Sequence, residues 1–354
     1  MPRRRASIDA SHADNGLPMN SVAEPRVSVV IPVYNGERMI ASAIESVLAQ
    51  SYTNWDLTIG DNRSTDGTAA VAQKFAARDS RIRVHTYPTH VSVIDSHSTA
   101  FTLISDEAKY CNVLGADDWF LPNYLERKVK LAEAHPTVGM VCSYVLAGSR
   151  VNGLALSYPS PCVPGREIIR RRLLNGLKGI GGPTTVMIRA DIVRAKRPFY
   201  NPLNYAGDIE AYLDLLLEHD LGFVHEVLTY MRTNEDSKTT SYLGRVASYY
   251  HDDIHEVTKF GPLVLTEPEY KARLKLATRT YYRMLGRSVL PFRGREFWDY
   301  HRKHVTKMGY SFSYMRVALN AALRVLDLIG NPKRTIESLV QRVSPDRDAE
   351  SAEQ

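Results

Sequence analysis

From residue 27 to residue 114 the chain alternates short apolar runs with longer stretches in which apolar residues recur every three or four positions. The short runs contain Val, Ile or Leu, as buried strands do. They span 27–31, 55–59, 82–85 and 110–114. The longer stretches have the period of helices and span 40–48, 68–75 and 99–108. This alternation predicts an α/β fold: a Rossmann-like, mostly parallel mixed sheet flanked by helices.

Beyond residue 114 the strands and helices are less evenly spaced. Further helices are predicted over 121–134 and 208–217. Further strands are predicted over 138–143, 181–188 and 223–228. The Gly-, Pro- and Ser-rich stretch 148–165 predicts a long loop, and only helical patterns follow residue 242.

These patterns divide the chain into four parts. Residues 1–25 are polar and small, which predicts a disordered N-terminal segment. Residues 26–235 form the predicted catalytic α/β domain, and 236–345 a basic helical C-terminal region. Residues 346–354 are predicted to be a disordered tail.

The composition is that of a soluble globular protein, with 44% hydrophobic and 24% charged residues. No window approaches the roughly 20 apolar residues that a membrane-spanning helix needs, so we expect none. Cys111 and Cys142 lie in apolar runs, and the three cysteines lack metal-ligand spacing. We therefore expect a reducing, cytoplasmic compartment.

The net charge of +6 is concentrated near the C-terminus, where bases outnumber acids from Lys271 onward. Such a stretch either binds an anionic partner, such as lipid head groups, nucleic acid or a phosphorylated acceptor, or is a solvated set of helix faces. The predicted helix over 314–329 has one apolar face. That face either packs on the catalytic domain or a second subunit, or lies on an anionic membrane.

Asp117 and Asp118 directly follow the predicted buried strand 110–114. The carboxyl ends of parallel strands are where an open α/β sheet binds its ligand. Two adjacent acids repel each other and lose solvation there, so a divalent cation holding a phosphorylated substrate would compensate them. Taken alone, the pair fits a polar loop with a helix-capping Asp better than a cation site.

Several ordered motifs in the first two-thirds of the chain resemble the family 2 nucleotide-sugar glycosyltransferases of the GT-A fold. The resemblance is carried by Val27-Ser-Val-Val-Ile-Pro-Val-Tyr-Asn-Gly36, by Ala43-Ile-Glu-Ser-Val-Leu-Ala-Gln-Ser-Tyr52, by Asp61 with Ser64-Thr-Asp-Gly-Thr68, by Ala116-Asp-Asp118, and by Ala206-Gly-Asp-Ile-Glu-Ala-Tyr-Leu213.

The resemblance implies how the donor is bound. Pro32, Tyr34 and Asn35 would border the nucleobase, with the Tyr34 ring stacked on it. Asp61 would accept from a ring N–H, which uracil, thymine and guanine offer. Asp117 would bind the ribose and Asp118 a Mn²⁺ or Mg²⁺ ion. From the residues alone, Tyr34 and Asp61 could also be a packed ring and the start of a turn.

The resemblance also implies the chemistry. Asp208 would be the general base that deprotonates an acceptor hydroxyl, giving a single displacement with inversion at the anomeric carbon. From the residues alone, Asp208 could also be an acid that stabilises the N-terminus of a helix. Glu210 is expected to be structural. The weaker binding candidates are His97 and His90, in a segment that contacts phosphate or sugar in relatives, and Asn234.

Four residues depart from the family pattern. The family often has an acid at Gly115 and a second acid at Asn62, and it usually has a glycine at Arg63 and a β-branched residue at Gly60. Because the site has fewer acids than is usual in the family, we expect donor phosphates and water to complete the coordination of the ion.

The leading hypothesis is transfer from a UDP-, dTDP- or GDP-sugar to a glycan or lipid-linked hydroxyl, in cell-surface polysaccharide or glycolipid synthesis. Nucleic acid is not an expected partner, whereas a homo-oligomer and peripheral membrane association are compatible with the tail.

One alternative is a degenerate relative that binds nucleotide-sugars without turnover. Another is a basic membrane- or nucleic-acid-binding protein. A nucleotidyltransferase would need a Gly-rich, basic loop after the first strand, which residues 32–36 lack.

Overall fold

The structure is a computed structural model that describes residues 24–201, 204, 206–232, 244–291, 293–307 and 311–331. Its centre is a mixed sheet in the order β3-β2-β1-β4-β9-β6-β10-β5, with β7 paired to β6 and β8 to β10. The strands are β1 Val27–Val33, β2 Trp55–Asp61, β3 Ile82–Thr86, β4 Tyr110–Val113, β5 Trp119–Phe120, β6 Val138–Ala147, β7 Arg150–Asn152, β8 Cys162–Val163, β9 Met187–Arg189 and β10 Asp220–Met231. The α/β fold class is confirmed.

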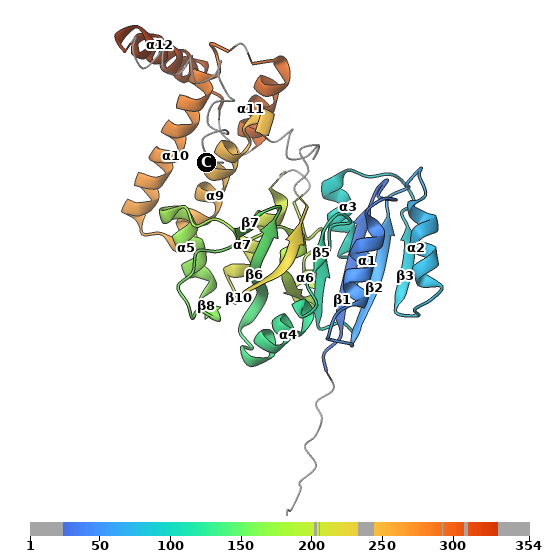
Figure 1. Cartoon of the computed structure of the whole chain (residues 1–354). Coiled ribbons are helices and arrows are strands. Elements are labelled where there is room, and N and C mark those ends of the chain that lie inside the picture. Colours follow the sequence, from blue (N-terminus) through green and yellow to red (C-terminus); the bar gives the residue numbers. More distant parts are fainter. Residues whose placement is uncertain are drawn as a thin grey trace, which may run out of the picture.

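Helices cover both faces of the sheet (Figure 1). The helices of the catalytic region are α1 Ile40–Leu48, α2 Thr68–Ala76, α3 Val93–Ala100, α4 Tyr124–Ala134, α5 Gly165–Asn175, α6 Ala190–Ala195 and α7 Gly207–Leu216, with the 3-10 turn η1 Pro183–Thr185. One core lies under α1, α2 and α4, and the other under α3, α5, α6 and α7. Alternate residues of β1 face the two cores, with Val29 in one and Val30 in the other.

The strand directions place one functional edge. β1, β2, β3 and β4 pair in parallel, and β6 and β10 run the same way because β9 lies antiparallel between β4 and β6. The carboxyl ends of six strands therefore share one edge, which we call the carboxyl edge. Helix α7 precedes β10 and returns across the sheet, so its first residues also lie at this edge.

The predicted helix over 99–108 is wrong, because the helix is α3 and ends at Ala100. Its start is capped by Ser92, whose side chain accepts from the Asp95 N–H. Phe101, Ile104 and Ala108 have helical spacing, but they are buried from turns. The predicted loop over 148–165 contains β7 and β8. The predicted strand over 181–188 is a strand only from Met187, in β9, whereas Pro183–Thr185 form η1, where Pro183 has no N–H for a ladder.

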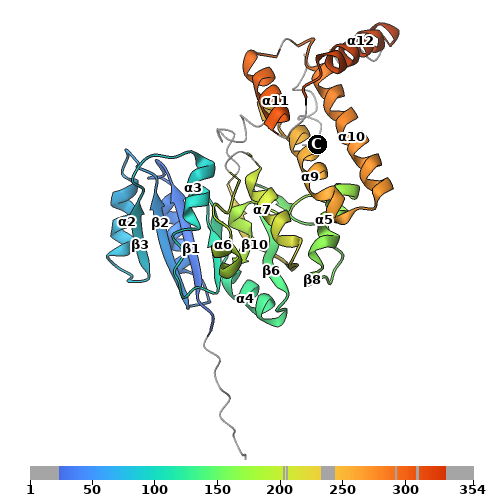
Figure 2. The same ribbon diagram turned by 180° about the vertical axis from the view of Figure 1, so that it is seen from behind.

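After β10, the described part of the chain contains the helices α9 Tyr249–Val264, α10 Glu267–Arg287, α11 Arg295–Lys307 and α12 Tyr314–Gly330. Helix α9 packs on α5, α10 on α9, and α12 on α10. Two arginines of α5 fix this stack: Arg172 forms a bidentate pair with Glu256 at 2.6 and 2.7 Å, and Arg170 pairs with Glu269. Figures 1 and 2 show these helices standing beyond the carboxyl edge, with α12 at the far end. No helix among the residues described is both long and apolar enough to cross a membrane.

Candidate active site

Two loops interlock at the ends of β1 and β2. The Asn35 N–H donates to Ser64 Oγ at 2.9 Å, and Asn35 Oδ1 accepts from the Thr65 N–H at 2.8 Å. The Gly36 N–H donates to Thr68 Oγ1 at 2.8 Å. Asn35 has a left-handed backbone with φ of 52°, a conformation that Asn tolerates better than most residues. In this structure the Asn35 side-chain oxygen therefore holds the loops together.

Tyr34 projects from the end of β1 beside His90. The Tyr34 side chain is 49% exposed, and its ring centroid lies 4.4 Å from that of His90, with the planes tilted by 50°. His90 Nδ1 lies 3.1 Å from the Asn62 carbonyl oxygen, so it carries the proton of this hydrogen bond when the ring is neutral. The pair leaves exposed aromatic surface at the carboxyl edge.

Asn62 explains why an amide replaces the acid that the family usually has. Its Nδ2 donates to the Val91 carbonyl and its Oδ1 accepts from the Val91 N–H, both at 2.9 Å. A carboxylate has no donor for the first of these bonds. Asn62 is 3% exposed and thus clamps the His90 segment to the end of β2.

Asp61 ends β2 next to Pro32 and Val33 of β1, with which Gly60 and Asp61 are in register. Its carboxylate is buried, and Oδ1 accepts from the Ser64 N–H at 3.1 Å. Gly60 is small because Tyr87 packs over it: a Cβ at Gly60 would lie 2.8 Å from the Tyr87 hydroxyl oxygen. Arg63 has φ of 62°, which accounts for the glycine usual at this position.

Asp118 is the most constrained acid of the site. Its Oδ2 accepts from the Thr184 hydroxyl at 2.6 Å, and its Oδ1 accepts from the Arg232 N–H at 3.2 Å. Burial raises the pKa of Asp118 to about 6, the Thr184 hydrogen bond opposes the rise, and the neighbouring Asp117 adds to it. The carboxylate is therefore costly to ionise without a cation.

Gly115 makes room for this arrangement. Its N–H donates to Thr184 Oγ1 at 3.0 Å, so the Thr184 hydroxyl bridges the main chain and the Asp118 carboxylate. A Cβ at Gly115 would lie 2.8 Å from Asp118 Oδ2 and 3.3 Å from Thr184 Oγ1. An acid at this position would displace the carboxylate from the place it now occupies.

Three buried side chains hold the η1 segment that carries Thr184. The Asn112 amide donates to the Val186 carbonyl at 2.5 Å, and the Tyr124 hydroxyl donates to the Thr184 carbonyl at 3.1 Å. Lys128 donates to the Thr185 carbonyl at 2.5 Å and to the Val141 carbonyl at 3.1 Å. Burial lowers the pKa of Lys128 to about 7. Thr184 is thus fixed from the core side.

His97 lies on α3 within electrostatic range of Asp117. Its Nδ1 bonds the Val93 carbonyl at 2.9 Å, so in the neutral ring this nitrogen is the protonated one. Burial lowers the pKa of His97, and the Val93 carbonyl and Asp117 partly oppose this. The charge of Asp117 therefore acts on the His97 ring, and half-buried Asp117 precedes Asp118 in the chain.

Asp208 lies in the first turn of α7, on the α9 side of the carboxyl edge. Burial raises its pKa to about 6, while the Ile209 N–H and Arg172 favour the charged form. Glu210 is the hub of a network: it accepts from Asn204 at 2.7 Å, Asn201 at 3.1 Å and Lys259 at 2.8 Å. The pKa of Glu210 is lowered because these donors and His255 outweigh its burial. Glu210 thus joins α7 to α9, and Asn234 lies outside the described residues.

The donor set suits an oxygen-preferring cation with few protein ligands. No described residue forms an ion pair with Asp118, and no three His, Cys, Asp or Glu side chains of the described ranges gather in a metal-binding arrangement. A buried carboxylate without a positive partner fits Mn²⁺ or Mg²⁺, which complete their coordination with phosphate oxygens and water. The ion would then require the donor for tight binding.

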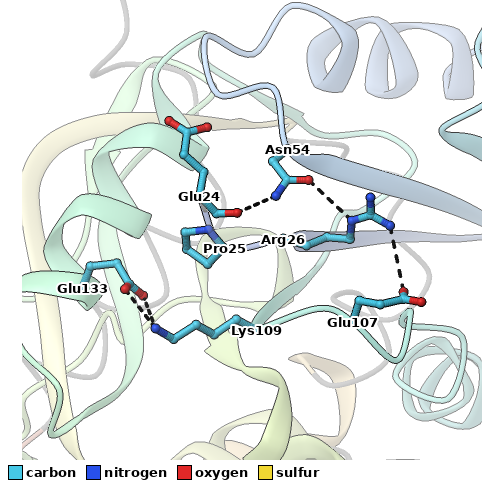
Figure 3. Close-up of a pocket in the computed structure, with 7 residues that line it drawn as sticks. All are labelled: Glu24, Pro25, Arg26, Asn54, Glu107, Lys109 and Glu133. Carbon is cyan, nitrogen blue, oxygen red and sulfur yellow. Dashed lines mark hydrogen bonds and ion pairs between the residues drawn. The ribbon is translucent and has the colours of Figure 1, made fainter. Parts of the chain in front are cut away.

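A cavity of about 570 Å³ lies at the opposite edge of the sheet, near the start of β1 (Figure 3). Its charged side chains neutralise one another: Arg26 lies 3.9 Å from Glu107, and Lys109 lies 2.7 Å from Glu133. The Asn54 amide donates to the Glu24 carbonyl. This cavity is remote from the strand ends that carry the acids, so it is no part of the candidate site.

Comparison with known sequences identifies the family. The model described as Glycosyl transferase family 2 matches residues 28–195. EpsE of Bacillus subtilis (strain 168), a protein named as a glycosyltransferase, is 30% identical over 224 residues, covering 60% of this chain and 75% of that protein. WfgD of Escherichia coli, named as UDP-Glc:alpha-D-GlcNAc-diphosphoundecaprenol beta-1,3-glucosyltransferase, is 27% identical over 199 residues, covering 56% and 73%.

Solved structures agree on the fold. S. aureus TarS 1-349 in complex with UDP superposes with a TM-score of 0.55 at 16% identity, covering 90% of this chain and 92% of that one. Mannosyltransferase PcManGT from Pyrobaculum calidifontis, in complex with GDP-Man and Mn²⁺, has a TM-score of 0.50 at 15% identity and covers 92% and 89%. The resemblance in the sequence motifs is confirmed: the chain belongs to glycosyl transferase family 2.

Proposed function

We propose that this glycosyltransferase moves a sugar from a UDP-, dTDP- or GDP-sugar to a hydroxyl of a glycan or lipid-linked acceptor, with inversion, in cell-surface polysaccharide or glycolipid synthesis. The observation that carries the proposal is the buried Asp118 carboxylate. It lies at the carboxyl edge beside Asp117 and has hydrogen-bond donors but no cation among the described residues. A carboxylate placed in this way suits a metal-bridged diphosphate.

The donor base would bind between the ends of β1 and β2. Tyr34 and His90 supply aromatic surface, and stacking on such a surface is worth about 1 to 3 kcal/mol per base. Asp61 is buried next to this surface and would accept from a ring N–H, with the Pro32 main chain beside it. Asp117 would accept from the ribose hydroxyls. His97, within range of Asp117, would bind the phosphate or sugar once the donor's charge favours its protonated form.

Asp118 would hold Mn²⁺ or Mg²⁺, and a bound ion of this kind neutralises charge on the departing nucleoside diphosphate. Asp208, at the start of α7, would take the proton from the attacking hydroxyl. Its pKa of about 6 leaves it mostly ionised at neutral pH and close to the value that favours proton transfer. With Asp208 as the only base, the acceptor hydroxyl would displace the nucleoside diphosphate in a single step, which inverts the configuration at the anomeric carbon.

Relatives support a UDP- or GDP-linked donor and a lipid-linked acceptor. The name of WfgD includes a UDP-Glc donor and a diphosphoundecaprenol acceptor. TarS is in complex with UDP, and PcManGT with GDP-Man and Mn²⁺. Thermal shift with UDP-, dTDP- and GDP-sugars, each with and without Mn²⁺, identifies the donor, because a ligand that binds only the folded state raises its stability.

Donor hydrolysis then separates an enzyme from a degenerate relative. We expect Mn²⁺-dependent release of the nucleoside diphosphate by the wild type and its loss in Asp118→Asn and Asp208→Asn. Equal hydrolysis by Asp118→Asn would refute the metal assignment. Donor binding without transfer to any acceptor in a broad panel would instead identify a nucleotide-sugar-binding protein.

A further inference from the structure

Helix α12 has an apolar face that points away from the rest of the protein. It packs on α10 through the side that contains Val317, which is 8% exposed, and Asn320, which lies against Gly286. The opposite side follows helical spacing of four and three residues. It consists of Met315, Leu319, Ala322, Leu326 and Ile329, and its four large side chains are 83, 59, 64 and 70% exposed.

This apolar face is wide, and the charged residues next to it, Arg316 and Asp327, lie on one side only. Leu323, which is 54% exposed, borders it on one side, and Ala318 and Val325 border it on the other. A seam between two helices of a coiled coil is narrow and carries charged residues at its flanks. A helix that lies in a membrane interface has a broad apolar face instead. The α12 face therefore fits a bilayer better than a second copy of the helix.

The neighbouring surface is strongly basic. Residues 267–330 contain thirteen Lys and Arg against five Asp and Glu, a net charge of +8 compared with +6 for the whole chain. Exposed bases recur at every fourth position of α10, at Lys275, Arg279, Arg283 and Arg287. Across the described parts of the chain, none of these four forms an ion pair with an Asp or Glu side chain. Their charge is thus available to an external anion.

A groove joins the apolar and basic features. It has a volume of about 570 Å³ and lies between α10 and α12, where Lys271, Lys275, Arg279 and Arg316 bring four bases to its walls. Arg316 stands over the Tyr282 ring, 5.4 Å from its centroid. An apolar floor with a basic rim suits the phosphate and upper acyl region of an anionic lipid.

Helix α12 lies on the same side of the protein as the carboxyl edge. In Figures 1 and 2, α12 lies at the far end of the helical stack, on the side of the sheet where the parallel strands end. The arginine pairs between α5 and the stack hold this arrangement. A bilayer under α12 would therefore lie on the side to which the carboxyl edge faces.

We propose that the α10–α12 surface docks the protein on an anionic lipid bilayer, with the apolar face of α12 inserted at the interface and the α10 bases against the phosphates. The proposal goes beyond sugar transfer and does not depend on it. Bilayer binding is measured without a donor, so its failure would leave the glycosyltransferase assignment untouched.

The experiment is co-sedimentation of the full chain with vesicles of phosphatidylglycerol and phosphatidylcholine, or of phosphatidylcholine alone. We expect binding to the anionic vesicles that weakens as salt is raised. Leu319→Ser/Leu326→Ser and Lys275→Glu/Arg279→Glu should each weaken it by about tenfold or more. The matched controls are Val151→Ser/Leu263→Ser, which are 58 and 50% exposed, and Lys74→Glu/Arg78→Glu, two exposed bases with the same spacing near α2. Both controls should bind as the wild type does.

Three results would overturn the proposal. The first is a wild-type chain that does not sediment with anionic vesicles. The second is equal binding by the α12 double variant, and the third is a loss of the same size in the controls. Light scattering tests the competing occupant: a dimer that Leu319→Ser/Leu326→Ser dissociates would make the α12 face a subunit interface instead.

Discussion

The Thr184 hydroxyl binds Asp118 from a distance of 66 residues in sequence, donating to Oδ2 at 2.6 Å while it accepts from the Gly115 N–H. Thr184 itself is held by buried Asn112, Tyr124 and Lys128 through the η1 main chain. The orientation of the proposed metal carboxylate is therefore set by the protein core before any donor binds.

Removing the Thr184 hydroxyl should weaken metal binding. Partners that orient a metal ligand typically contribute about 10- to 100-fold to affinity, and we expect a loss of that size in Thr184→Val. Thr184→Ser should restore most of it. The affinity is measured by titrating Mn²⁺ in the presence of UDP. The control is Thr229→Val, because the buried Thr229 hydroxyl has no hydrogen-bond partner among the described residues. Equal affinity in wild type and Thr184→Val would refute the role.

Gly115→Ala should reduce donor turnover. The new methyl group would lie 2.8 Å from Asp118 Oδ2, so the carboxylate must move. A misplacement of about 1 Å can cost on the order of 100-fold in rate. Gly182→Ala is the matched control, since a Cβ there meets nothing within 4 Å. Rates are compared by nucleoside diphosphate release, and equal rates for Gly115→Ala and wild type would show that the space is not needed.

His90→Ala should weaken UDP or GDP binding by about fivefold, the lower end of what one aromatic stacking contact contributes. Asn62→Asp should have a similar effect, because its second oxygen would face the Val91 carbonyl and release the His90 segment. Binding is measured by calorimetry. His85→Ala, an exposed histidine of β3, is the control. Unchanged affinity in His90→Ala would show that His90 does not contribute to nucleotide binding and that Tyr34 alone supplies the aromatic surface.

The rate should depend on the ionisation of Asp208. As a base it works only when deprotonated, so kcat/KM should fall as pH drops through about 6. Asp252 adds to the elevation of this pKa, so Asp252→Asn should move the acidic limb to lower pH. The measurement is the pH profile of donor hydrolysis for both proteins. An acidic limb at the same pH in both would exclude this coupling.

The sequence pattern predicted those strands and helices that can be recognised from their own residues. Runs such as β1 and β6 are long and apolar, and α1 has a clear helical period, so each was visible without its neighbours. β5 and β8 have two residues each and exist because β10 pairs with them. The prediction of a helix over 99–108 was wrong because Phe101 and Ile104 have helical spacing but reach the core from turns.

The same distinction applies to the site. Tyr34, Asp61 and Asp118 stand in motifs that are continuous in sequence, so their places could be predicted. Thr184 is an ordinary threonine until the fold brings it to Asp118, and the Arg232 N–H has no side-chain signature at all. The role of Asn62 is likewise visible only once Val91 lies opposite it.

Stability should fall at acidic pH through the buried histidines between α9 and α11. Burial lowers the pKa of His301 to about 4, whereas an unfolded histidine titrates near 6.5. Between these values the unfolded chain binds a proton that the folded chain does not, so the free energy of unfolding decreases as pH drops from about 6.5 to about 4. The difference corresponds to about 3 kcal/mol for this residue. His301→Gln can still bond the Tyr281 hydroxyl but does not titrate, so it should lose less stability between pH 7 and pH 5. Urea unfolding of both proteins at these pH values measures the slopes, with His85→Gln as an exposed control. Parallel slopes for wild type and His301→Gln would show that the proton uptake lies elsewhere.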